Sequence, residues 1–335
     1  MRFRNCYTTA FTPRNRNRTT AIVTATATAF QNLAHFTFDN PPHILANNWS
    51  SATSVCDWIG VSCGKQHRRV IALNLPDMGI GGTIPTHIGN LSFLSYFDII
   101  NNTFHGHLPG EIARLHRLKV VDFRINNFGG GVPAWFGNLP KLQYLFLSNN
   151  SSTGSVPASI GNISTLESLD LEYNFLEGRV PEEIGYLPKL KRFDGQIPST
   201  LGECSQLQII SLSSNKFSGF IPNAIGNLTL LRILYLGLNN FKGEIPHELR
   251  SLHNLETLGV ESANITGLIP SFIFNISSMK GLYLRTNNLF GSLPRDMCSH
   301  HSSLQMMYLG NNKLTGNIPR AIGKCTLLSI REMIM

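Results

Sequence analysis

Apolar positions recur along the chain with a period of 24 residues. Leu142–Asn150, LQYLFLSNN, shows the repeated pattern L-x-x-L-x-L-x-x-N. Its L-x-L part alternates with period two, which predicts a short strand with both leucines on one face. Further along the period, IGNLSFL at Ile88–Leu94 spaces its apolar residues by three. That spacing predicts one 3₁₀ or helical turn packing inward.

Each period ends on a proline, with a glycine three residues before it in all eleven cases. Asparagine stands seven residues before the proline in eight of the eleven, where its amide can satisfy backbone groups as the chain leaves the strand. The marker prolines are Pro85, Pro109, Pro133, Pro157, Pro181, Pro198, Pro222, Pro246, Pro270, Pro294 and Pro319.

A strand followed by a short helical return at this period is the leucine-rich repeat. One such unit cannot bury its apolar face alone, so neighbouring units must stack. We therefore predict an α/β leucine-rich-repeat solenoid. Its curved parallel β-sheet would form the concave face, 3₁₀ or helical returns the convex face, and about eleven repeats the stack, one of them shortened.

The shortened unit lies near residues 187–198, where the proline interval falls to 17 residues. Leu187, Leu190 and Phe193 match the start of a unit, but Gly195 arrives seven residues early. The second half of the strand and its asparagine are missing. We expect the sheet to narrow or bulge there with Phe193 filling the gap; a hinge and a lost stretch of coding sequence both remain open.

The ending L-x-G-x-I-P, as in LTGNIP at Leu314–Pro319, resembles the plant-specific subclass of these repeats. C-x-W-x-G-V-x-C at Cys56–Cys63 resembles the plant N-terminal cap, which implies a Cys56–Cys63 disulfide and Trp58 seated over the first unit. The chain is most similar to ectodomains of plant leucine-rich-repeat receptor-like kinases. That resemblance implies a location outside the plasma membrane, a bound peptide or protein elicitor and a co-receptor carrying the same repeats.

The resemblance divides the chain into four parts. Residues 1–33 form a tail, 34–69 the cap, 70–330 the solenoid and 331–335 an uncapped end. The basic, threonine-rich tail suits a secretory signal, an organellar transit peptide or a disordered or misassigned start. No apolar stretch is long enough to span a bilayer, and no kinase motif comes after the repeats. We expect a truncated receptor or a fragment.

Composition narrows the function classes. Charged residues make up 14% of the chain, and five of the arginines behind its net charge of +8 lie in the first 40 residues. The remaining chain has too little positive charge to favour nucleic-acid binding. No metal-ligand spacing or catalytic motif is present, so we predict neither metal nor cofactor nor enzymatic activity. Asp170 and Glu172 share a strand face, but we expect water around them rather than acid–base chemistry.

The alternation also predicts which side chains face outward from the strands. Six of these are aromatic, and exposed aromatic residues on a rigid surface suit protein binding. The predicted ligand-contacting residues are Tyr96, Asp98, Asp122, Arg124, Tyr144, Phe146, Asp170, Glu172, Tyr235, Glu261, Tyr283, Arg285 and Tyr308.

Sequons and cysteines favour a secretory history. Cys204 and Cys325 take the place of an inward leucine and are predicted to be buried thiols, whereas Cys6 and Cys298 have no evident mate. The predicted glycosylation sites are Asn48, Asn90, Asn101, Asn162, Asn227, Asn264 and Asn275.

These observations support a non-catalytic recognition module, the extracellular ligand-binding part of a receptor-like kinase. An alternative is a secreted enzyme inhibitor resembling the polygalacturonase-inhibiting proteins. Those proteins share this repeat subclass, but they close the array with C-terminal cysteines, and this chain has none after Cys325.

Overall fold

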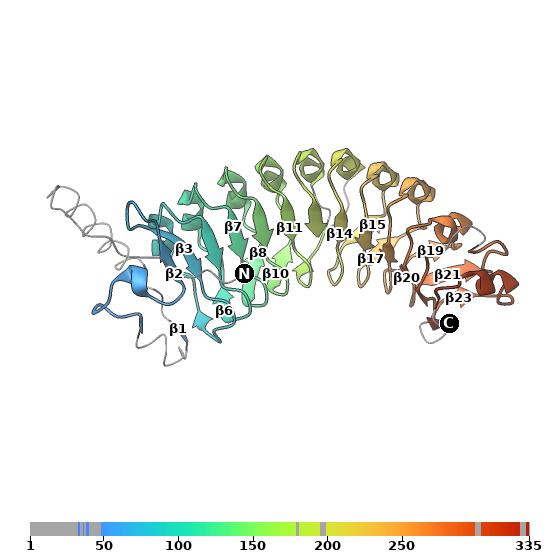
Figure 1. Cartoon of the computed structure of the whole chain (residues 1–335), viewed down its shortest axis with the longest axis horizontal. Helices are drawn as coiled ribbons and strands as arrows, with labels where there is room; N and C mark the ends of the chain where they lie inside the picture. The colour runs from blue at the N-terminus through green and yellow to red at the C-terminus, as the bar shows by residue number, and fades with distance from the viewer. Residues whose placement is uncertain are drawn as a thin grey trace.

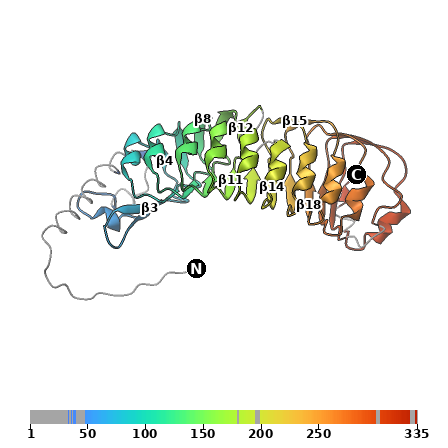
Figure 2. The same ribbon diagram turned by 90° about the horizontal axis from the view of Figure 1, so that it is seen from above.

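The units stack side by side into an arc, with the strands on its inner side and the 3₁₀ returns on its outer side (Figure 1). The computed structural model describes residues 33, 36, 38–39, 48–178, 181–194, 199–298, 303–328 and 333–334. Seen from above, the returns line up along the convex face (Figure 2). The predicted solenoid is confirmed.

One long sheet of 13 strands forms the concave side, and from β3 onward all of its strand pairs are parallel. Parallel pairing arises because every strand is reached by the same return over the convex side. The strands are β2 (Val61–Cys63), β3 (Val70–Asn74), β5 (Tyr96–Asp98), β7 (Val120–Asp122), β9 (Tyr144–Phe146), β11 (Ser168–Asp170), β13 (Arg192–Asp194), β14 (Ile209–Ser211), β16 (Ile233–Tyr235), β18 (Thr257–Gly259), β20 (Gly281–Tyr283), β22 (Met306–Tyr308) and β24 (Met333–Ile334). The strand β24 continues this sheet past residue 330, the predicted end of the solenoid.

Shorter strands around the repeated glycines form lateral sheets beside the concave one. The first contains β1 (Phe38–Asp39), β4 (Gly81–Gly82), β6 (Thr103–Gly106), β8 (Asn127–Gly131), β10 (Ser151–Gly154) and β12 (Phe175–Leu176). A second pairs β15 (Ser218–Phe220) with β17 (Asn240–Lys242), and a third contains β19 (Thr266–Gly267), β21 (Asn288–Gly291) and β23 (Lys313–Leu314). Among the described residues, the lateral layer is thus interrupted twice, between β12 and β15 at the short unit and again between β17 and β19.

The returns are 3₁₀ helices, except that residues 295–298 after Pro294 form a turn, and apart from η1 in the cap each helix starts immediately after a marker proline. Proline suits this place because its fixed φ is compatible with an extended residue that donates no hydrogen bond. The helices are η1 (Val55–Asp57), η2 (Thr86–Asn90), η3 (Gly110–Arg114), η4 (Ala134–Asn138), η5 (Ala158–Asn162), η6 (Glu182–Tyr186), η7 (Ser199–Glu203), η8 (Asn223–Asn227), η9 (His247–Ser251), η10 (Ser271–Asn275) and η11 (Arg320–Lys324).

A single apolar core runs through the stack, and a ladder of asparagines closes its edge. Asn239 is typical: its Nδ2 donates to the Leu212 and Leu236 carbonyls at 2.8 and 3.1 Å, and its Oδ1 accepts from the Phe217 amide at 3.1 Å. One amide therefore joins two units and satisfies buried backbone groups in both.

The N-terminal cap covers the first unit with aromatic residues. Trp58 is buried, its ring stacks on Trp49 at 4.9 Å between centroids, and its Nε1 donates to the Thr53 hydroxyl at 3.0 Å. Cys56 and Cys63 form the disulfide that the resemblance implied. The apolar end of the solenoid is thereby shielded from water.

The cysteine predictions need one correction. Cys204 is a buried free thiol, and burial raises its pKa to about 11. Cys325, predicted to be a free thiol as well, instead forms a disulfide with Cys298, which had no evident mate. Cys298 takes the place that glycine holds in other returns, and adjacent returns lie side by side, so the two sulfurs meet between consecutive units.

The short unit keeps its strand but lacks the residues that normally extend it. β13 pairs with β11 at three positions and with β14 at only two, so the sheet narrows there, and Phe193 is fully buried. Beyond the strands the units on either side bond directly: the Tyr173 amide donates to the Ser213 carbonyl, and Asn215 Nδ2 donates to the Leu171 carbonyl at 3.3 Å. The Asn215 Oδ1 is buried and finds no partner among the described residues.

Candidate ligand-binding face

Outward residues alternate with buried ones along each strand, and the strands pair in register, so outward side chains of successive units line up in columns across the concave face. There are three columns: the first and last residues of each three-residue strand form two of them, and the residue two positions after the strand, such as Arg124 or Glu172, forms the third. Phe97, Val121 and Leu145 point into the core, while the residues on either side of them face outward. Among the predicted contact residues, Arg285 is exposed. The half-buried residues are Tyr96, Arg124, Tyr144, Phe146, Glu172, Tyr235, Glu261, Tyr283 and Tyr308. Asp98, Asp122 and Asp170 are buried.

The N-terminal half of this face is acidic, and two of its aspartates, Asp98 and Asp122, are held by residues two positions away in the chain. Tyr96 Oη donates to Asp98 Oδ2 at 2.9 Å, while burial and this bond raise the pKa of Tyr96 to about 12. Arg124 donates to both oxygens of Asp122, with Nε to Oδ1 at 2.8 Å and Nη2 to Oδ2 at 2.5 Å. This bidentate pair raises the pKa of Arg124 further.

The prediction that water surrounds Asp170 and Glu172 is wrong for Asp170, which is buried, whereas Glu172 is half-buried. Asp170 is only 4% exposed, and burial raises its pKa even though the Ser148 hydroxyl donates to it at 2.9 Å. Burial, together with the nearby charge of Asp170, raises the pKa of Glu172 to about 7. Ser148 covers Asp170 from the adjacent unit, because neighbouring strands are closely spaced. Ser211 on β14 reaches Glu172 across the short unit and donates to its carboxylate.

The C-terminal half of the face is aromatic. The rings of Tyr283 and Tyr308 are stacked 5.2 Å apart with an interplanar angle of 12°, and Tyr235 lies 6.3 Å from Tyr283. Glycines make room for them: a Cβ at Gly259 would lie 2.5 Å from Cδ1 of Tyr235, and one at Gly281 would lie 2.8 Å from Cε2 of Tyr283. We call Tyr235, Tyr283 and Tyr308 the tyrosine strip.

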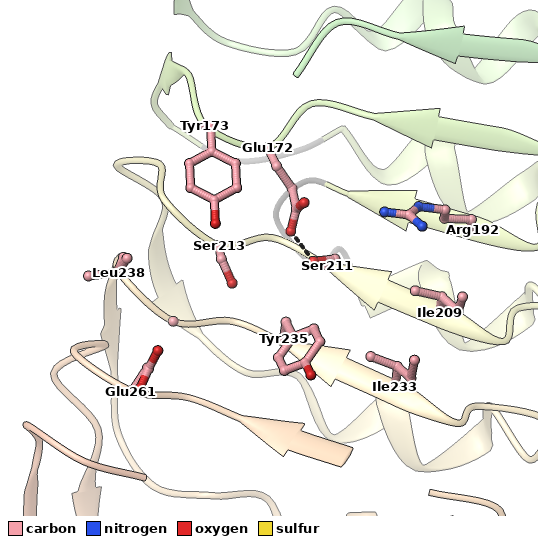
Figure 3. Close-up of a pocket in the computed structure, with 11 residues that line it drawn as sticks. Glu172, Tyr173, Arg192, Ile209, Ser211, Ser213, Ile233, Tyr235, Leu238 and Glu261 are labelled. Atoms are coloured by element: carbon pink, nitrogen blue, oxygen red, sulfur yellow. Dashed lines mark hydrogen bonds between the residues drawn. The ribbon is translucent and has the colours of Figure 1, made fainter. Parts of the chain in front are cut away.

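A hollow of about 400 Å³ separates the two halves, beside the short unit. The small residues Ser211 and Ser213 lie between two carboxylates, Glu172 on one side and Glu261 on the other (Figure 3). Gly237 also lines the hollow. The remaining lining residues are Tyr173, Arg192, Ile209, Ile233, Tyr235 and Leu238. Most of these were not predicted, although alternation alone places Arg192, Ile209 and Ile233 on the outward face.

The basic loop at residues 64–69 lies at the N-terminal end of the solenoid. Arg69 and Arg117 sit over the Phe93 ring, with their guanidinium carbons 4.3 and 4.0 Å from its centroid. These cation–π contacts fix the two arginines at the edge of the structure, away from the tyrosine strip.

The predicted glycosylation sites lie outside the concave strands. Asn90, Asn162, Asn227 and Asn275 are on the 3₁₀ returns, the first three exposed. Asn101 and Asn264 are exposed at turns with positive φ. The amide oxygen of Asn48 accepts from the Ile59 amide within the cap.

The described part of the chain shows neither a metal-binding cluster nor a membrane span. Across those ranges, no three His, Cys, Asp or Glu side chains gather closely enough to hold a metal ion. No helix in the same residues is long and apolar enough to cross a membrane.

Family models match much of the solenoid and its cap. A model described as leucine rich repeat matches residues 116–176 and 253–314, and a second of that name matches 206–228 and 230–252. A model described as leucine rich repeat N-terminal domain matches residues 28–64.

Several similar proteins are plant receptor kinases. The LRR receptor-like serine/threonine-protein kinase EFR of Arabidopsis thaliana is 41% identical over 81 residues, 24% of this chain and 8% of that protein. The chain thus matches a small part of this curated relative.

Two solved structures extend the similarity over most of the chain. The ectodomain of the receptor kinase GASSHO1/SCHENGEN3 from Arabidopsis thaliana, in complex with CASPARIAN STRIP INTEGRITY FACTOR 2, has a TM-score of 0.75 and 29% identity, covering 93% of this chain and 44% of that one. The plant peptide hormone receptor RGFR1, in complex with RGF2, has a TM-score of 0.67 and 33% identity, covering 76% and 41%. The chain therefore belongs to the leucine-rich-repeat proteins and resembles the ectodomains of plant receptor-like kinases.

Proposed function

We propose that this protein is a non-catalytic recognition module that binds an extended peptide, or an extended segment of a protein, on its concave face outside the cell. In this proposal the chain itself only binds the ligand. A partner, such as a co-receptor with the same repeats, would recognise the occupied face and transmit the signal. The observation that carries the proposal is the tyrosine strip, a set of partly exposed rings held on a rigid sheet. Such rings bury much area at little entropic cost when a ligand covers them.

Three further observations support an extracellular peptide receptor. The two disulfides suit an oxidising compartment. The sequons among the described residues leave the concave strands free of glycans. Two similar solved structures are plant receptors in complex with their ligands.

The test uses the whole chain secreted from insect cells and a phage-displayed library of random dodecamer peptides. Selected peptides are synthesised, and their affinities are measured for wild type, for Y283S/Y308S, and for the matched control Y186S, which removes an exposed tyrosine from the convex return η6. We expect Y283S/Y308S to weaken binding at least tenfold, as loss of central aromatic contacts does, and Y186S to leave it unchanged. Failure to select any peptide, or equal losses in both variants, would overturn the proposal.

A further inference from the structure

The hollow beside the short unit is a consequence of the missing residues. A full unit would place the equivalents of Leu147–Thr153 between Asp194 and Gly195, including one more outward side chain in the third column. Without them, the next residues after Glu172 in that column are Ser213 and Gly237, which fill little space. A cavity therefore opens at this place in an otherwise continuous face.

The charges around the hollow are unequal. Glu172 and Glu261 stand on opposite sides, and Asp170 lies behind Glu172. Arg192 is the cation in the lining, with its guanidinium turned toward Glu172 (Figure 3). Arg285 lies outside, with Nε 3.6 Å from an oxygen of Glu261 in a solvent-exposed pair. The carboxylates of Asp170, Glu172 and Glu261 therefore outnumber the Arg192 guanidinium around the hollow.

The remaining lining suits an aliphatic stem. Ile209 and Ile233 lie side by side on β14 and β16, and Tyr235 borders them at the start of the tyrosine strip (Figure 3). A long cationic side chain buries its methylene groups against apolar surface and keeps its charged end with polar partners. The volume of about 400 Å³ is sufficient for one such side chain with water around it.

We propose that the hollow lined by Glu172, Glu261, Ile209 and Ile233 is an anchoring pocket for one arginine or lysine side chain of the peptide ligand. The inference rests on the proposed function for its biological meaning, but the pocket itself can be tested without a peptide. The cationic end would lie between the two carboxylates, the stem would lie along the isoleucines, and the rest of the peptide would continue over the tyrosine strip. Opposite charges then fix the register of the ligand on a face that repeats every 24 residues.

The direct test uses N-acetyl-arginine amide as the probe, at millimolar concentration, with N-acetyl-citrulline amide as its neutral counterpart. Binding is monitored by NMR on protein with labelled isoleucine methyl groups, where I209V and I233V assign the two signals in the hollow. We expect saturable shifts of these two signals with the arginine compound, none with the citrulline compound, and loss of the shifts in E172Q/E261Q. The control E183Q removes an exposed carboxylate from the convex return and should behave as wild type.

A second variant tests the origin of the pocket. Inserting a copy of residues 147–153 between Asp194 and Gly195 completes the unit and should abolish the arginine-induced shifts while the protein remains folded. Equal shifts with both compounds, no saturable shift in wild type, or shifts that persist in E172Q/E261Q would overturn the pocket. Such a result would leave the tyrosine-dependent peptide binding standing, so the two proposals fail separately.

The pH dependence adds a readout that an apolar pocket would not show. The groups facing Glu172 are Asp170 at the end of β11, Arg192 on β13, Ser211 at the end of β14 and Ser213 just after it. Since Glu172 must lose its proton to attract a cation, the arginine compound should saturate at lower concentration at pH 8 than at pH 5.5. Equal saturation at both values would contradict a role for Glu172.

Discussion

At the scale of single residues, the asparagine ladder shows how one side chain can stabilise two units. Asn239 makes hydrogen bonds with both ends of its amide, whereas Asn215, next to the short unit, uses only its Nδ2. The alternation and the fixed place of asparagine were readable from the sequence. The missing partner of Asn215 Oδ1 was not readable from the sequence, because it depends on which backbone groups lie near this oxygen once the short unit lacks its seven residues.

The two asparagines should therefore differ when replaced by alanine. N239A leaves several buried backbone groups without partners and should lower the free energy of unfolding by about 3 kcal/mol. N215A removes longer bonds and a partnerless oxygen, so we expect a loss of about 1 kcal/mol. Urea unfolding of the purified chain measures both. Equal losses would show that the ladder is not broken at the short unit.

Glu172 gives stability a pH dependence of known sign. Its pKa rises from 4.5 to about 7 on folding, so the folded state holds a proton that the unfolded state has released. Its contribution to stability is complete below pH 4.5 and is lost as the pH rises through 7. Because solvent screens this partly exposed side chain, we expect a contribution of only about 1–2 kcal/mol.

The variant E172Q should remove this contribution. Relative to wild type, its melting temperature should fall less between pH 4.5 and pH 8. Parallel melting curves over that range would contradict the raised pKa. The burial behind this effect was not readable from the sequence, because alternation says which way a side chain points but not how closely its neighbours cover it.

At the scale of elements, some neighbouring 3₁₀ returns pack so closely that a side chain at their glycine would clash with the next return. A Cβ at Gly137 in η4 would lie 2.3 Å from the Ser159 carbonyl oxygen in η5. At Gly323 in η11, the equivalent glycine of the last unit, an added Cβ would have no atom of the described structure within 4 Å. The period predicted where the returns begin, and the close contact explains why position 137 is a glycine.

Alanine at these two glycines is a matched comparison. G137A forces adjacent returns apart and should cost about 1–3 kcal/mol of unfolding free energy. G323A should change stability by no more than about 0.5 kcal/mol, since nothing opposes the new methyl group. Thermal and urea unfolding give both values. A G323A loss as large as that of G137A would point to backbone strain instead of packing.

At the scale of the whole molecule, each unit packs on its immediate neighbours, with direct bonds across the short unit as well, so a change at one end should stay local. The disulfide Cys298–Cys325 joins residues 27 positions apart at the C-terminal end. Sequence spacing did not reveal it, because Cys298 occupies a glycine position in a unit lengthened to 25 residues. The solenoid architecture was predictable from the repeats. Predicting this disulfide would have required knowing that the two returns that carry Cys298 and Cys325 lie side by side.

C298S/C325S should destabilise the C-terminal units by up to about 3 kcal/mol. Hydrogen exchange should accelerate in residues 294–328 and remain unchanged in residues 61–178, far along the stack. Faster exchange over the whole chain would mean that the solenoid unfolds as one cooperative unit.

The central claim is that ligand binding takes place on the concave face, and hydrogen exchange of the secreted protein with and without the tightest selected peptide tests it most directly. The account predicts slowed exchange in the strands from β11 to β22, which carry the hollow and the tyrosine strip, with the convex returns unchanged. Protection confined to the returns, or to the lateral strands, would contradict it.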